Sequence, residues 1–224
     1  GTAAPAAGPW LLEVEQVAPC DHPQLKVRLR GPLGDARAAE ATARRALAHL
    51  LGLEVDLSGF YALASSDAQL GALVASLPGL RPQRYLTLFE ALLNCISCQQ
   101  VSLAAGLSAL SRLAEAYGPR LTIDGHVYAA PPAAATVAAL EPEALRACGY
   151  SRRKAEYLIG LAQALCSGAL TKAELEEASN DAVARRLTAL RGLGRWSAQY
   201  VMLRGLGRLD VFPVDDVGAA RNLA

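Results

Sequence analysis

The chain has 224 residues, a formal net charge of +1 and 52% hydrophobic residues, so it can bury a full core as one large or two small domains. No apolar run approaches the roughly 18 residues that cross a bilayer, and the N-terminal GTAAPAAGP lacks the basic region and apolar core of a signal peptide. The nearly neutral charge neither favours nor excludes an anionic partner.

The N-terminal part of the chain predicts a small α+β piece. Residues 11–17 (LLEVEQV) and 25–31 (LKVRLRG) alternate between apolar and polar side chains as strands do, and the turn-rich APCDHPQ lies between them. A helix is predicted over residues 36–51, ending at Gly52. Two strands are too few to form a stable sheet by themselves, so residues 1–65 are interpreted as a partial N-terminal α+β (sheet) domain.

After residue 65 the patterns indicate helices and no further strand. The predicted helices cover residues 67–77, 84–99, 102–117, 142–148, 151–167 and 180–190. Short loops that join helices of this length are typical of an all-α bundle. Residues 66–224 are therefore predicted to form a helical domain, which makes the whole chain mostly α.

The five cysteines are Cys20, Cys95, Cys98, Cys148 and Cys166. An odd number without a secretory signal favours free thiols in a reducing compartment, so we expect a cytoplasmic protein. Cys95 and Cys98 form a C-x-x-C motif, but no second pair stands at a metal-binding spacing. Their apolar helical surroundings favour buried thiols over a redox or zinc site.

The segment LRGLGRW, residues 190–196, places Gly192 and Gly194 between two predicted helices. Glycine permits the positive φ that such a turn is expected to need at these positions, and it leaves backbone amides uncovered. The N-terminus of the next helix adds a partial positive charge, so the segment predicts an anion site, which would bind a phosphodiester backbone without a net basic charge. The glycines alone fit an ordinary close-packed helix turn equally well.

The longer stretch LRGLGRWSAQYVMLRGLGRLDVFPVDD, residues 190–216, resembles the helix-hairpin-helix and catalytic-aspartate region of the DNA glycosylases that excise damaged bases. Within that superfamily it resembles the alkylation-repair branch, 3-methyladenine DNA glycosylase II. FEALLNCISCQQVSLAAG and LRACGYSRRKAEYLIGLAQAL resemble preceding helices of that branch, and LLEVEQV with LKVRLRG resembles the end of its N-terminal sheet domain. The branch has further strands before this region and further helices after it, so the resemblance implies a shortened chain.

The resemblance assigns the catalytic aspartate to Asp216, the second carboxylate of PVDDVGAAR. Cleavage of an N-glycosidic bond builds positive charge on C1′. A fixed carboxylate stabilises that charge and orients or deprotonates the attacking water. Asp215 remains the alternative, and either aspartate suits the N-cap of a helix in VGAARNLA, residues 217–224.

The same resemblance assigns Trp196 and Tyr200 to the pocket that receives the flipped base. They are four residues apart and therefore share one helix face. An alkylated purine is electron-poor, and electron-rich aromatic faces bind it by stacking and cation–π attraction. Plain core packing is the alternative for Tyr200.

DNA contacts are implied for Gln100 and for the glycine turn. Gln100 matches the residue that enters the duplex and fills the gap left by the flipped base, although a polar helix end is the alternative for QQ. Gly192, Gly194 and Arg195 match the residues that contact the DNA backbone.

The family's hairpin also holds a monovalent cation through backbone carbonyls. The carbonyls that match are those of Thr188, Leu190 and Leu193, so a structural Na⁺ or K⁺ is expected there. No cofactor is expected to be required for the reaction.

The predicted function is hydrolytic removal of alkylated bases, of the 3-methyladenine type, from double-stranded DNA by base flipping in base excision repair. Glycosylases that also cut the strand have a Schiff-base lysine where this chain has Trp196, so base removal alone is expected. A non-catalytic helix-hairpin-helix DNA-binding module, or a glycosylase for oxidised or deaminated bases, remains the alternative. We expect a monomer that contacts no membrane.

Overall fold

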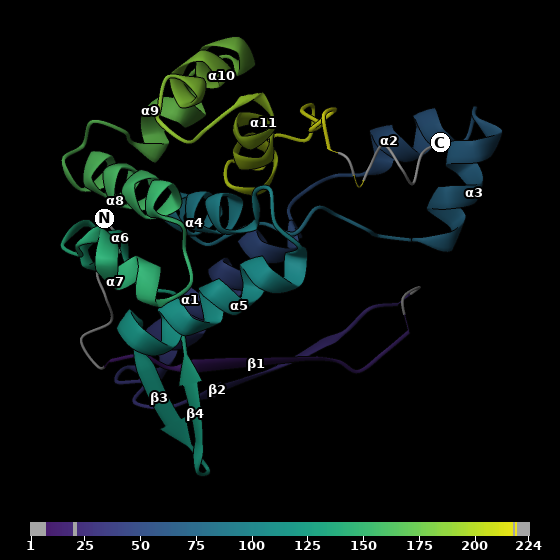
Figure 1. Ribbon diagram of the computed structural model, residues 1–224. Coiled ribbons are helices and arrows are strands. Elements are labelled where there is room, and N and C mark those ends of the chain that lie inside the picture. The colour runs from purple at the N-terminus through teal and green to yellow at the C-terminus, as the bar shows by residue number, and fades with distance from the viewer. Residues whose placement is uncertain (1–7, 20–21, 217, 219–224) are drawn as a thin grey trace. The chain divides into compact units, whose positions relative to one another are not determined.

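A computed structural model describes residues 8–19, 22–216 and 218 of the chain, and Figure 1 shows its ribbon. The chain forms two compact units, the first up to Gln83 and the second from Arg84. Each unit is described separately, beginning with the N-terminal one.

The first unit contains the predicted α+β piece. Strands β1 (Leu11–Gln16) and β2 (Leu25–Arg30) pair in antiparallel register. Helix α1 (Ala36–Leu51) is capped by Asp35, whose carboxylate accepts hydrogen bonds from the backbone amides of Arg37 and Ala38. It ends at Gly52, which adopts the left-handed conformation, as the sequence predicted.

Two further helices, α2 (Ser58–Ala64) and α3 (Ala68–Ser76), also belong to the first unit. They pack against each other, and the Arg81 guanidinium donates a hydrogen bond of 3.1 Å to the carbonyl of Val55 in the segment after α1. These contacts connect residues up to 83 with the N-terminal elements. The boundary between the units therefore lies later in the chain than the predicted division after residue 65.

The second unit is the predicted helical bundle. Its helices are α4 (Leu88–Cys98), α5 (Leu103–Tyr117), α6 (Ala134–Ala138), α7 (Pro142–Ala147), α8 (Arg152–Cys166), α9 (Lys172–Glu177), α10 (Asn180–Thr188) and α11 (Arg195–Arg204). Helix α4 packs against α5, α8 and α11, and its Leu92, Leu93 and Ile96 side chains are almost wholly buried. Helix α10 packs against α11, and Figure 1 shows the two helices next to each other. The core of the bundle thus lies around α4.

A short β-hairpin after α5 was not predicted. Strands β3 (Arg120–Ile123) and β4 (His126–Ala129) pair antiparallel around Asp124 (φ 50°) and Gly125 (φ 78°). The expectation that no strand follows residue 65 is therefore wrong. The Asp-Gly dipeptide between apolar-rich segments is a strong hairpin signal, and it was present in the sequence.

None of the described helices is long and apolar enough to cross a membrane. Within the described residues, no group of three or more His, Cys, Asp or Glu side chains is arranged to hold a metal ion. Cys95 is wholly buried, and this burial raises the pKa of its thiol to about 12. The expectation of buried thiols therefore holds for Cys95, while Cys98 is partly exposed. Cys20 lies outside the described residues.

Candidate active site

The turn between α10 and α11, residues 189–194, is called here the glycine hairpin. The amide of Leu193 donates 3.2 Å to the carbonyl of Leu190, which closes the turn. Gly192 has a φ of 90°, a conformation that side chains rarely adopt, and a Cβ on it would lie 2.4 Å from the Tyr157 ring. Only glycine therefore fits at position 192.

Gly194 differs from the expectation. It is the N-cap of α11 with φ −99° and ψ −171°, an extended conformation open to any residue, so the expected positive φ is wrong for this glycine. A Cβ on Gly194 would meet nothing within 4 Å. The structure gives α11 no side-chain cap, so the glycine leaves the amides at the start of this helix uncovered.

Predicted site residues that belong to three separate segments of the chain line one cavity of about 520 Å³. Its lining residues are Cys98, Gln99, Gln100, Val101, Gly192, Gly194, Trp196, Ser197, Asp215, Asp216 and Gly218. The end of α4, the glycine hairpin and the segment after α11 thus meet in the second unit. The cavity brings together the predicted residues Gln100 (the plug, which fills the gap left by a flipped base), Gly192, Gly194, Trp196 and Asp216. Arg195 and Tyr200 are not among the lining residues.

The two neighbouring aspartates have different partners. The Trp196 indole Nε1 donates a hydrogen bond of 2.9 Å to Asp216 Oδ2. Asp215 instead forms an ion pair of 3.6 Å with Arg195, and its side chain is 53% exposed. Asp216 is therefore the half-buried carboxylate held against an aromatic ring of the cavity. The helix predicted in residues 217–224 lies outside the described residues, except for Gly218.

Arg208 positions the segment that carries Asp216. Its guanidinium donates hydrogen bonds to the carbonyls of Leu175 and Ala178, each at 2.6 Å, and to Asn180 Oδ1 at 2.5 Å. The Asn180 amide in turn donates 2.7 Å to Asp210 Oδ2. The loop between α11 and Asp216 is therefore held against the junction of α9 and α10, a role that the sequence did not predict for Arg208.

Tyr200 supports Trp196 from the side of the bundle. The two rings stack with centroids 5.3 Å apart and an interplanar angle of 27°. The Tyr200 hydroxyl donates 2.8 Å to Asn94 Oδ1 and lies 2.7 Å from the Tyr85 hydroxyl, while burial raises the pKa of Tyr200. The Arg204 guanidinium lies over both tyrosine rings. Tyr200 thus fixes the orientation of Trp196.

Tyr85, Asn94 and Arg204 are absent from the predicted site. Asn94 had a usable signal, because it interrupts the apolar face of LFEALLNCIS. Tyr85 stands before α4 and had no comparable signal.

Gln99 was also missed, although it is adjacent to the predicted plug. Gln99 Nε2 donates 2.6 Å to the hydroxyl of Ser197 on α11 and 3.2 Å to the carbonyl of Gly192. Gln100 is exposed and lines the cavity. The end of α4 is therefore tied to the glycine hairpin through the residue before Gln100.

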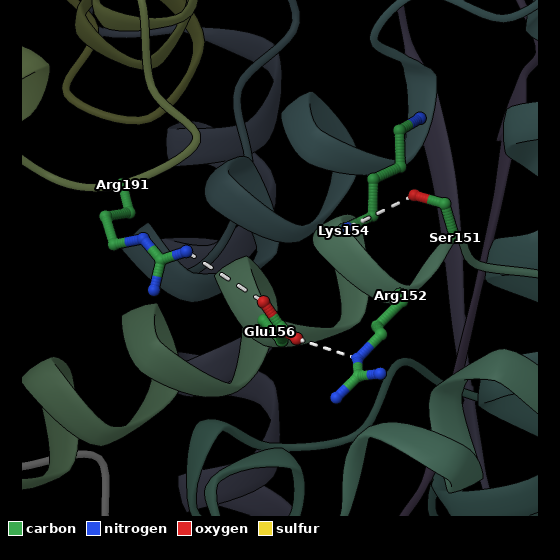
Figure 2. Close-up of polar contacts among 5 residues, drawn as sticks. All are labelled: Ser151, Arg152, Lys154, Glu156 and Arg191. Carbon is green, nitrogen blue, oxygen red and sulfur yellow. Dashed lines mark hydrogen bonds and ion pairs between the residues drawn. The ribbon is translucent and has the colours of Figure 1, made fainter.

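Arg191 of the glycine hairpin and Arg152 of α8 share one carboxylate, that of Glu156. Figure 2 shows Glu156 between Arg152 and Arg191, with ion-pair distances of 3.2 and 3.9 Å. The Arg191 guanidinium also lies 5.7 Å from the centroid of the Tyr157 ring. Because both arginines are well exposed, these pairs add little to stability, and the arginines stay available to an anionic partner.

The sequence is similar to known proteins along most of its length. Residues 93–224 match the family described as HhH-GPD superfamily base excision DNA repair protein. A DNA-3-methyladenine glycosylase of Bacillus subtilis is 31% identical over 212 residues, which cover 93% of this chain and 69% of that protein. DNA-3-methyladenine glycosylase 2 of Escherichia coli is 38% identical over 153 residues, 67% of this chain and 52% of that protein.

The fold has a counterpart among solved structures. The 3-methyladenine DNA-glycosylase from Archaeoglobus fulgidus superposes with a TM-score of 0.79 at 26% sequence identity. The match covers 96% of this chain and 70% of that one. This chain therefore spans between about half and seven-tenths of the length of these relatives.

Proposed function

Because the chain belongs to the HhH-GPD superfamily of base excision DNA repair proteins, we propose that it removes alkylated bases of the 3-methyladenine type from double-stranded DNA. The observation that carries this proposal is the pairing of Asp216 with the Trp196 indole in a cavity that Gln100 and Gly192 also line. A non-catalytic DNA clamp has no use for a carboxylate held in this way. The arrangement therefore favours an enzyme.

Asp216 supplies the negative charge that the reaction needs. As the base departs, positive charge develops on C1′ of the flipped nucleotide, and a carboxylate already in place stabilises it without reorganisation. The indole N–H fixes the orientation of that carboxylate before the bond breaks. The ring face of Trp196 stacks on the electron-poor base, so one residue serves both the base and the catalytic group.

The glycine hairpin binds the DNA backbone. The uncovered amides at Gly194 and the N-terminus of α11 donate to a phosphate, and Arg195 adds charge beside them. Such contacts position the protein without reading bases. Gln100, which lines the same cavity, fills the gap in the duplex and slows the return of the base.

A monovalent cation at the glycine hairpin is also proposed. Carbonyl oxygens are the hard ligands that Na⁺ and K⁺ take, and the Leu190 carbonyl accepts the Leu193 amide, which leaves it a second lone pair. Thr188, Leu190 and Leu193 would hold the ion, whose charge would strengthen the attraction for a phosphate.

The decisive experiment uses duplexes that carry 3-methyladenine, 7-methylguanine, hypoxanthine or 1-methyladenine, with abasic sites scored after alkali. We expect 3-methyladenine to be released fastest. Preferred release of hypoxanthine would instead support the alternative glycosylase for deaminated bases. DNA binding with no release of any base would support the non-catalytic module.

Gel filtration of the free protein and of its DNA complex tests the proposal that a monomer acts.

Trp196→Phe is expected to lower the rate constant for excision by about tenfold, because the variant keeps an aromatic face and loses the hydrogen bond to Asp216. Single-turnover kinetics with saturating protein measure this rate constant. Tyr85→Phe is the control, since it also removes one part-buried hydrogen-bonding group of an aromatic residue, a hydroxyl that pairs with Tyr200 and not with Asp216. An unchanged rate in Trp196→Phe would show that the indole N–H does not position the carboxylate.

No covalent enzyme–DNA adduct is expected on borohydride treatment, because base removal by water forms no Schiff base. The lysines of the chain are Lys26, Lys154 and Lys172, and none follows the glycine hairpin. A denaturing gel after treatment with sodium borohydride makes the measurement, and strands should break only after alkali. Recovery of a trapped adduct in quantity would overturn the proposal of base removal alone.

A further inference from the structure

The backbone of Gln100 is held in an unusual conformation. Its φ is 52°, in the left-handed region that residues with a side chain rarely adopt. Such a conformation persists only where surrounding groups hold it, and it often occurs at functional sites. Gln100 follows directly after the end of α4, and its side chain is exposed at the cavity.

Lys154 holds the chain immediately before Gln100. Its ammonium donates 3.0 Å to the carbonyl of Ser97 and 2.7 Å to the carbonyl of Gln99. These carbonyls are at the end of α4, where a helix leaves its last acceptors without partners, and a positive charge is favourable there. Figure 2 shows Lys154 on the first turn of α8, which the hydroxyl of Ser151 caps.

Gln99 connects the same turn to the glycine hairpin. The backbone carbonyl of Gln99 accepts a hydrogen bond from Lys154. Its side-chain Nε2 donates to the Gly192 carbonyl and to the Ser197 hydroxyl. The residue before Gln100 is therefore fixed from α8 on one side, and from the hairpin and α11 on the other. A change in this turn would alter the direction of the Gln100 side chain.

We propose that Lys154 and Gln99 are positioning residues that hold the Gln100 backbone, so that its side chain enters the gap left by a flipped base. They also connect this plug with the phosphate-binding hairpin, so that both parts contact the duplex in one fixed geometry. The inference rests on the proposed function for the role of Gln100. Neither residue takes part in breaking the glycosidic bond.

The test measures the preference of the full chain for a duplex with a tetrahydrofuran abasic analogue over an undamaged duplex, by fluorescence anisotropy at fixed salt. A 2-aminopurine opposite the analogue reports whether the gap is filled. Lys154→Met is expected to lower the preference by about tenfold, the scale of lost charge-assisted hydrogen bonds. Gln99→Ala should do the same, and Lys154→Arg should largely restore the preference.

Matched variants separate positioning from a general loss of structure. Lys172→Met removes a lysine whose ion pair with Glu176 is on the surface, and it should leave the preference unchanged. Lys154→Met combined with Gln100→Ala should lose no more preference than Gln100→Ala alone, because both changes remove one plug. Thermal melting of each variant identifies any that fails to fold, and Lys154→Arg and Gln99→Ala then decide the result.

The inference is wrong if folded Lys154→Met keeps the wild-type preference and 2-aminopurine signal, or if its effect multiplies that of Gln100→Ala. A wild-type protein with no preference for the abasic analogue would also overturn it. These binding measurements need no excision. A protein that prefers the analogue through Lys154 and releases no base would therefore overturn the proposed enzyme and leave the positioning role supported.

Discussion

Asp216→Asn is expected to lower the rate constant for base excision by about 100-fold or more, while the affinity for duplex DNA changes little. Asparagine has nearly the same shape as aspartate, and its carbonyl can still accept the Trp196 N–H that now reaches Oδ2. The substitution therefore removes the charge opposite C1′ and leaves the cavity in place. Single-turnover excision and fluorescence anisotropy measure the two quantities on the same duplex.

Asp215→Asn provides the matched control, because the two aspartates are adjacent and differ in their partners. Its carboxylate pairs with Arg195 at 3.6 Å on an exposed surface, where such pairs contribute about 0–1 kcal/mol. We expect a change in excision rate of about fivefold at most. An inactive Asp215→Asn beside an active Asp216→Asn would reverse the assignment of the catalytic carboxylate.

Gly192→Val is expected to lower the free energy of unfolding by about 2–4 kcal/mol. A side chain there must adopt a φ of 90°, and its Cβ would lie 2.4 Å from the Tyr157 ring, so backbone and ring must both shift. Because Gly192 also accepts from Gln99, the shift would reach the turn that carries Gln100. Urea unfolding measures the loss of stability, and anisotropy the loss of duplex affinity.

Gly194→Val separates DNA contact from folding. The extended φ of −99° and the open space around a Cβ mean that the side chain adds no steric strain. The free energy of unfolding should therefore fall by at most about 1 kcal/mol, the cost of a poorer N-cap residue. The added side chain covers the amides at the start of α11, so duplex affinity should fall by about 1–3 kcal/mol. Damaged and undamaged duplexes should lose similar amounts, since phosphate contacts do not read bases. Wild-type binding by folded Gly194→Val would exclude these amides from the DNA contact.

Most of the longer helices of both units were predictable from local patterns. Helices α1 and α5 begin and end within a residue of their predicted limits. Their ends are set by residues close in sequence: Asp35 and Ser102 cap the first turns, and Gly52 and Gly118 follow the last turns. The unit boundary was not predictable in this way. It depends on contacts such as that of Arg81 with the Val55 carbonyl, and nothing in the local pattern indicates them.

The site shows the same division. The resemblance to the DNA glycosylases predicted Gln100, Trp196 and Asp216 as site residues, and these residues line one cavity. Three further residues act through hydrogen bonds to backbone carbonyls that are distant in the sequence: Gln99, Lys154 and Arg208. No local sequence pattern indicates such a partner. A backbone acceptor carries no signature of its own in the sequence.

The hexapeptide LRGLGR occurs twice, at residues 190–195 and 203–208, and it separates the two kinds of information. In both copies the sequence by itself determines that a helix ends or is interrupted, because glycine makes positive φ accessible. Which glycine uses that freedom differs: Gly192 (φ 90°) is the first glycine of its copy, and Gly207 (φ 74°) is the second of the other. The Tyr157 ring packs against Gly192 and the Arg84 side chain against Gly207, so tertiary contacts select the conformation of each copy.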